Sequence, residues 1–280
     1  MTKSRKQVRN SSERILTRCP RRIHREEVAI ISTNHAYSSV ELQELSSRLI
    51  TALHLSAGPI GISFTDARPD GIELFDEPMV EASADGRTGR VSAGCVFWMK
   101  ATESSFSTIP SDHGNCSVGS FTHGLVALDD VAANSDVTEL LGSGWVDTDA
   151  VAAIPFVGRR YQFVNYGPLS MGEFMPDVVL LRLNGRQMMV VSDATGMPIE
   201  GKPQCHIVAV AKEQGRVAAS VGCALSRART GMQPYEMTCA IPGGRLAEIV
   251  AAIEKAADID GGVAKYAASD ARRFAGDAAR

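Results

Sequence analysis

Four of the six cysteines in this chain lie beside predicted turns and helix starts, where a thiol can react or bind a metal. They are Cys95, Cys116, Cys205 and Cys223. The thiolate form of cysteine is both a nucleophile and a ligand for soft metals. The gaps between the four are long and irregular, and the sequence has no Cys-x-x-Cys pair, so zinc-finger and zinc-ribbon spacings are excluded. A site made from these residues requires the fold to bring distant segments together.

Four thiolates from separate segments match an iron–sulfur cluster, with a tetrahedral zinc ion as the lesser alternative. If only three were ligands, one iron would be open to a small-molecule substrate. His113 or His206 could then replace a thiolate or act as an acid or base. The competing interpretation is that free cysteines are buried as small hydrophobic residues. That interpretation suits Cys19, in a polar leader, and Cys239, inside a strand pattern.

Two other function classes stay open at this point, and with them whether the chain is an enzyme. Cys116 follows Asp112 and His113 closely, which would suit a metal-free thiol enzyme with Cys116 as nucleophile. A cysteine and histidine three residues apart are more often partners in a local cap. Arg227 follows Cys223 and could hold an anionic ligand, so Asp112, His113 and Arg227 are the candidate catalytic residues. The third class is a non-catalytic small-molecule-binding module.

The elements that must position these residues can be predicted from local patterns. Ser38 with Glu41 forms a capping box for a helix over residues 39–55. Residues 177–183 and 235–241 have the apolar content of buried strands, and a helix begins at Cys205. Pro242 is expected in the first turn of a C-terminal helix. Strands mixed with helices predict an α/β fold, or a mixed α+β one, with a single mixed sheet and flanking helices over residues 37–258.

The two ends of the chain differ from this body in composition. Residues 1–25 hold nine Lys and Arg but one acid, although the whole chain carries a net charge of −3. We expect a disordered basic leader over residues 1–36 and a loose Ala- and Gly-rich tail over residues 259–280. The acidic body argues against nucleic acid as the main partner. No apolar run suggests a membrane span or a secretory signal, so a cytoplasmic protein with reduced thiols is expected, and its size and charge permit a homodimer.

Several short motifs, taken in order, point to a family. Gly119 follows Cys116, P-D-V-V-L occupies residues 176–180, Arg227 follows Gly222-Cys223, and E-M precedes I-P at residues 241–242. In this order the chain resembles the prokaryotic family called domain of unknown function 169, over about residues 40–255. Members often carry Cys-Pro-Gly-Gly where this chain has Cys-Ser-Val-Gly at residues 116–119. The resemblance implies no settled activity. It implies that the four cysteines recur together, as expected if they meet in space.

Overall fold

The computed structural model describes most of the predicted domain. The described residues are 36–76, 93–114, 116–133, 135–144, 147–197, 199–200, 204–230 and 232–277. The basic leader expected over residues 1–36 therefore lies outside them, apart from residue 36. Residues 34–280 form one compact unit.

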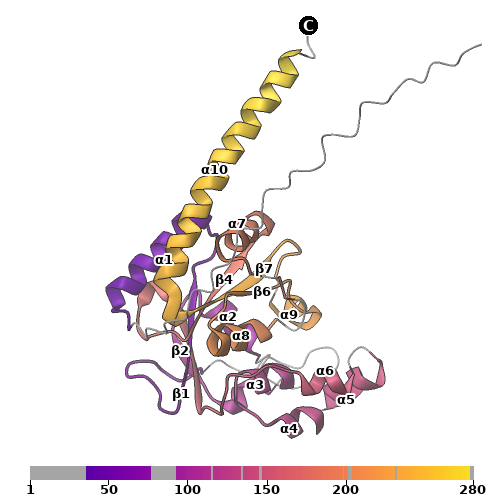
Figure 1. Ribbon diagram of the computed structural model, residues 1–280. Coiled ribbons are helices and arrows are strands. Elements are labelled where there is room, and N and C mark those ends of the chain that lie inside the picture. The colour runs from indigo at the N-terminus through magenta and orange to yellow at the C-terminus, as the bar shows by residue number, and fades with distance from the viewer. Residues whose placement is uncertain are drawn as a thin grey trace, which may run out of the picture. The chain divides into compact units, whose positions relative to one another are not determined.

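The centre of the domain is one seven-stranded sheet within the described residues, with the order β2-β3-β1-β4-β7-β6-β5. Neighbouring strands are antiparallel except the short pair β5 and β6, which is parallel. The strands are β1 (Ile60–Thr65), β2 (Phe106–Thr108), β3 (Phe163–Pro168), β4 (Val178–Leu183), β5 (Ile199–Glu200), β6 (Ala218–Ser220) and β7 (Met237–Pro242). The predicted mixed sheet with flanking helices is confirmed (Figure 1).

Helices flank the sheet and join its strands. They are α1 (Ser39–Leu53), α2 (Gly94–Lys100), α3 (Ser117–Thr122), α4 (Leu128–Ala133), α5 (Ser135–Gly142), α6 (Thr148–Ala152), α7 (Gly185–Thr195), α8 (His206–Gln214), α9 (Ala224–Thr230) and α10 (Leu246–Asp277). The capping box predicted at the start of α1 is present, with the Ser38 amide donating to Glu41 at 2.8 Å. Asn184 and Gln187 form a second capping box at the start of α7.

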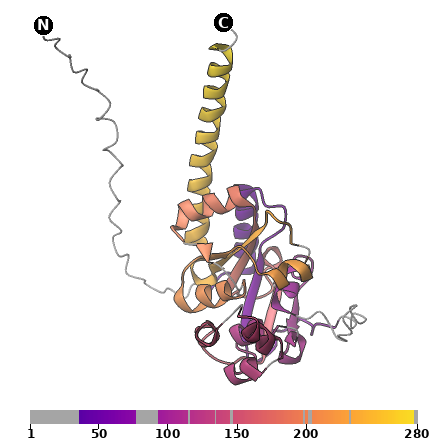
Figure 2. The same cartoon turned by 90° about the vertical axis from the view of Figure 1, so that its right-hand side faces the viewer.

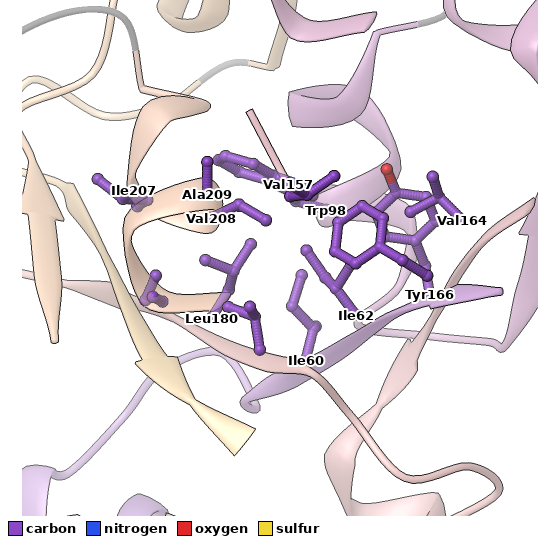
Figure 3. Packing of buried hydrophobic residues seen from close by; sticks show 14 of the residues in the cluster. Ile60, Ile62, Trp98, Val157, Val164, Tyr166, Leu180, Ile207, Val208 and Ala209 are labelled. Carbon is purple, nitrogen blue, oxygen red and sulfur yellow. The ribbon is translucent and has the colours of Figure 1, made fainter. Parts of the chain in front are cut away.

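The alternation of side chains along β4 divides the interior into two cores. Val178 and Leu180 lie in a core with residues of α2 and α8, whereas Val179 and Leu181 lie in a core with residues of α1, α7 and α10. Successive strand residues point to opposite faces, so a strand covered on both faces, such as β4, is apolar along most of its length. Figure 3 shows the first core, where Ile207 and Val208 of α8 face the strand residues Ile60, Ile62 and Leu180.

The C-terminal helix differs from the prediction at both of its ends. Pro242 ends β7, and a 3-10 turn over Gly243–Arg245 precedes the first residue of α10, Leu246. The loose tail expected from residue 259 is helical as far as Asp277, and α10 projects beyond the body of the domain (Figure 2). Residues 247–276 are rich in alanine, the strongest helix former, and this outweighs Gly261 and Gly262 within the helix.

Candidate functional site

The four candidate cysteines occupy equivalent places at the starts of four helices. Cys95 is the second residue of α2, Cys116 is the N-cap residue of α3, and Cys205 is the N-cap residue of α8. Cys223 immediately precedes α9. The helices pack in pairs, α2 with α9 and α3 with α8. Segments far apart in the sequence therefore meet on the face of the sheet that carries Leu180.

The Cys205 sulfur links the other three electrostatically. Burial raises the pKa of the Cys205 thiol well above its usual value, and the neighbouring Cys116, Cys223 and Cys95 sulfurs raise that pKa further. A neighbouring thiolate raises the pKa of a thiol because two negative charges near each other disfavour ionisation. Cys95 and Cys205 also pack against the Leu180 core. The structure thus places Cys205 within electrostatic range of the other three candidate cysteines, and all four are free thiols.

Backbone amides at two of these helix starts point at sulfur. The Gly119 amide donates to Cys116 Sγ at 3.4 Å, and the Ser226 amide donates to Cys223 Sγ at 3.2 Å. Such hydrogen bonds, together with the partial positive charge of a helix N-terminus, favour the thiolate. A Cβ atom at Gly119 would lie 3.2 Å from Cys116 Sγ, so glycine at this position leaves the sulfur room beside the helix.

The spacing of the four sulfurs bears on what they could hold. Zinc bonds sulfur at about 2.3 Å, so four thiolates around one zinc ion lie about 4 Å apart. Among the described residues, no group of three or more His, Cys, Asp or Glu is gathered closely enough to hold one metal ion. Electrostatic repulsion between thiolates acts over longer distances than a metal–sulfur bond. The sulfurs are therefore neighbours that are not drawn around a single ion.

Asp112 and His113 form a tight turn that leads into Cys116. The Asp112 carboxylate accepts the Ile109 amide at 2.9 Å, and His113 Nε2 lies 2.9 Å from the Thr108 hydroxyl. The His113 carbonyl accepts the Cys116 amide at 3.3 Å. His113 is 1% exposed, and burial lowers its pKa well below the usual value. The backbone of His113 thus shapes the approach to Cys116, while its imidazole is held neutral in the core.

Arg227 forms hydrogen bonds with the backbone on both sides of α9. Its guanidinium donates to the carbonyls of Val221, Gln233 and Glu236. These three bonds hold together the loop that contains Cys223 and the start of β7. The side chain of Glu236 pairs instead with Arg182, at 2.7 Å. The geometry therefore gives Arg227 a positioning role for the Cys223 loop.

Sequence reasoning missed a set of buried polar rings near Cys95. His123 is the C-cap residue of α3 and is fully buried, and a Cβ atom at Gly94 would lie 2.5 Å from its ring. Neither ring nitrogen of His123 has a hydrogen-bond partner within the described part of the chain. Tyr166, labelled in Figure 3, is also fully buried, and burial together with the nearby Cys95 raises the pKa of its hydroxyl. No spacing or motif signals these rings, because they come from separate elements.

Replacing His123 by phenylalanine should make the protein less sensitive to acid. Burial lowers the pKa of His123 from 6.5 to about 4. Below pH 6.5 the unfolded chain takes up a proton that the folded protein refuses, so stability is full above pH 6.5 and falls as the pH drops to 4. One such histidine accounts for about 3 kcal/mol of unfolding free energy over that interval. Urea unfolding of wild type and H123F at pH 7, 6 and 5 measures this slope.

The control for this measurement is His54→Asn, because His54 is exposed at the end of α1. Asparagine also tolerates the left-handed backbone of that position. We expect H54N to keep the wild-type slope. An H123F slope equal to that of wild type would contradict the assignment of the acid sensitivity to His123.

These features define a mixed α/β protein with four cysteines gathered at helix starts on one face of its sheet. The chain belongs to the family of uncharacterised ArCR proteins, domain of unknown function 169, whose family model matches residues 48–252. The match includes all four cysteines and confirms the resemblance found in the sequence. No curated protein and no solved structure matches the chain. Among the described residues, none of the helices has the length and apolar character needed to cross a membrane.

Proposed function

We propose that Cys95, Cys116, Cys205 and Cys223 bind an iron–sulfur cluster, and that the protein is a cysteine-ligated metalloprotein acting on or binding a small molecule. The observation that carries this proposal is the coupling of Cys205 to the other three sulfurs. Four partly buried thiols near one another are unfavourable as thiolates without a cation, since burial and like charges both oppose ionisation. A bound thiophilic metal makes the thiolate form favourable, because the metal cation replaces the protons on the ligating sulfurs.

The arrangement favours a cluster over a single zinc ion. A cluster places several iron and sulfide atoms between its cysteine ligands, so the ligands lie further apart than they do around one ion. A cluster can therefore take ligands from scattered segments, and the four cysteines lie at or beside the starts of four separate helices. Zinc remains the lesser alternative, because four thiolates also match its preferred ligand set.

The chain supplies a setting suited to an electron-rich group. The amides of Gly119 and Ser226 already point at two of the sulfurs. Hydrogen bonds to sulfur and burial are the factors by which proteins set the potential of a cluster. Such a cluster would supply electron transfer, or a Lewis-acidic iron if one ligand position were open. The hydrogen bonds from the Arg227 guanidinium to backbone carbonyls would hold the loop that contains Cys223 in place.

Purification without oxygen tests this proposal directly. We expect bound iron and acid-labile sulfide in stoichiometric amounts, with absorption near roughly 400 nm that is bleached by a reductant. Stoichiometric zinc without sulfide would support the lesser alternative. Protein that carries neither metal, and that takes up none from ferrous iron and sulfide under reducing conditions, would contradict both.

One observation favours a second candidate, a metal-free thiol enzyme with Cys116 as nucleophile. The Gly119 amide on Cys116 Sγ is the kind of contact that stabilises a reactive thiolate. Alkylation that is confined to Cys116 and abolishes the activity of a metal-free preparation would establish it. The small-molecule substrate, a homodimer and a cytoplasmic location stay predictions.

A further inference from the structure

A small cavity lies between α2 and the sheet, beside the cysteine site. Its volume of about 10 Å³ has room for one water-sized group. Helix α2 provides Trp98, the turn after it provides Thr102, and strands β4 and β7 provide Arg182 and Thr238. The remaining lining residues are Gly58, Ile60, Leu180 and Leu181. Gly58 is exposed, so the cavity reaches solvent at that end.

Three buried polar atoms from the lining residues have no hydrogen-bond partner within the described part of the chain. They are Trp98 Nε1, Arg182 Nε and Thr238 Oγ1. Arg182 and Thr238 are directly opposite each other in the β4–β7 pair, so their side chains leave the sheet on one face. Trp98 is 4% exposed and comes from α2 above them. An unpaired buried donor costs about 1–3 kcal/mol, so three at one cavity require an occupant.

The chemistry of the occupant follows from these atoms. The indole N–H and the guanidinium Nε–H can only donate, so the occupant must accept hydrogen bonds from both. The charges of the side chains beside the cavity also favour an occupant that accepts hydrogen bonds. Arg182 pairs with Glu236 at 2.7 Å, and Arg227 is close enough to lower the pKa of that carboxylate. Two arginines facing one glutamate leave a net positive charge beside the cavity, which favours an anion over water.

We propose that this cavity binds one carboxylate oxygen of a small organic acid, whose remaining atoms extend toward solvent past Gly58. Trp98 lies three residues after Cys95 on α2, so an acid held here lies next to the helix that starts at the cysteine site. The inference stands on the cavity and its donors alone. It would hold whether or not the cysteines bind metal.

Formate is the probe, because it is the smallest carboxylate and one of its oxygens is the water-sized group that the cavity can take. We expect sodium formate to raise the thermal unfolding midpoint of the protein by a few degrees in a saturable way, relative to sodium chloride at equal ionic strength.

Thr238→Val removes one donor without changing the shape of the side chain, and it should abolish most of that shift. In an NMR titration, formate should also move the indole N–H signal that is missing from W98F.

The matched control is Ser46→Ala, which removes another buried hydroxyl without a partner, in α1. We expect S46A to keep the full formate shift. The proposal is overturned if formate does no more than chloride, if T238V keeps the wild-type shift, or if the Trp98 signal does not move. Should T238V fold poorly, Arg182→Lys provides the second variant, since lysine retains a charge for Glu236 and lacks the Nε–H donor.

Discussion

Replacing Cys205 by serine should remove at least about nine-tenths of the bound iron and sulfide from protein purified without oxygen. Cys205 is electrostatically coupled to the other three candidate sulfurs, so its loss affects the whole proposed ligand set. Serine has nearly the same volume but offers a hard, protonated hydroxyl that soft metals bind poorly. Loss of a residue that merely supports a ligand already costs about 10–100-fold in metal affinity, and loss of a ligand should cost no less. Iron and sulfide content and the absorption near roughly 400 nm measure the effect.

Cys239→Ala is the matched control for C205S. Cys239 is fully buried within β7, and burial raises its pKa to about 12, as expected for a structural thiol that never ionises. It lies in the core on the opposite face of the sheet from the cysteine site. C239A should therefore keep its iron and sulfide. The proposed cluster is refuted if C205S, shown to be folded by circular dichroism, retains the metal content of C239A.

Gly243→Ala should destabilise the folded protein by about 3 kcal/mol or more, the range of severe core overpacking. A Cβ atom at Gly243 would lie against the carbonyl oxygen of Pro176, well inside contact distance. Because this carbonyl oxygen belongs to the backbone, it cannot rotate away as a side chain would. The Gly243 amide also donates to the Asp177 carbonyl at 2.7 Å, which fixes the turn between β7 and α10. Urea unfolding monitored by circular dichroism measures the loss of stability.

The neighbouring glycine provides the comparison. A Cβ atom at Gly244 would meet no atom within 4 Å, so Gly244→Ala should change stability by less than about 1 kcal/mol, and in the stabilising direction if the backbone angles suit alanine. Both variants make the same chemical change one residue apart. Equal unfolding midpoints for G243A and G244A would show that the turn can open without cost and that the close approach to Pro176 does not hold it.

Elements with a strong local signal were predictable, and those settled by distant contacts were not. The helix at residues 39–53 was predictable because Ser38 and Glu41 cap it and its leucines share one face. The strand at residues 178–183 was predictable because both of its faces are buried. Pro242 was wrongly expected inside a helix, because its pairing with Val178 in the sheet cannot be seen in the local sequence. The tail from residue 259 was expected to be loose from its Ala- and Gly-rich composition, but it is helical to Asp277 because alanine is the strongest helix former.

The sequence by itself determined the chemical types at the site: four thiols near turns, a strand end and helix starts, in a chain without the spacing of a zinc finger. These features are local, since caps, turns and residue types depend on neighbours within a few positions. Only the tertiary structure decided that α2, α3, α8 and α9 meet on one face of the sheet and that Cys205 couples to the other sulfurs. It alone placed Trp98, Arg182 and Thr238 around one cavity. Contacts of this kind depend on strand order and helix packing, which a linear pattern does not encode at any fixed spacing.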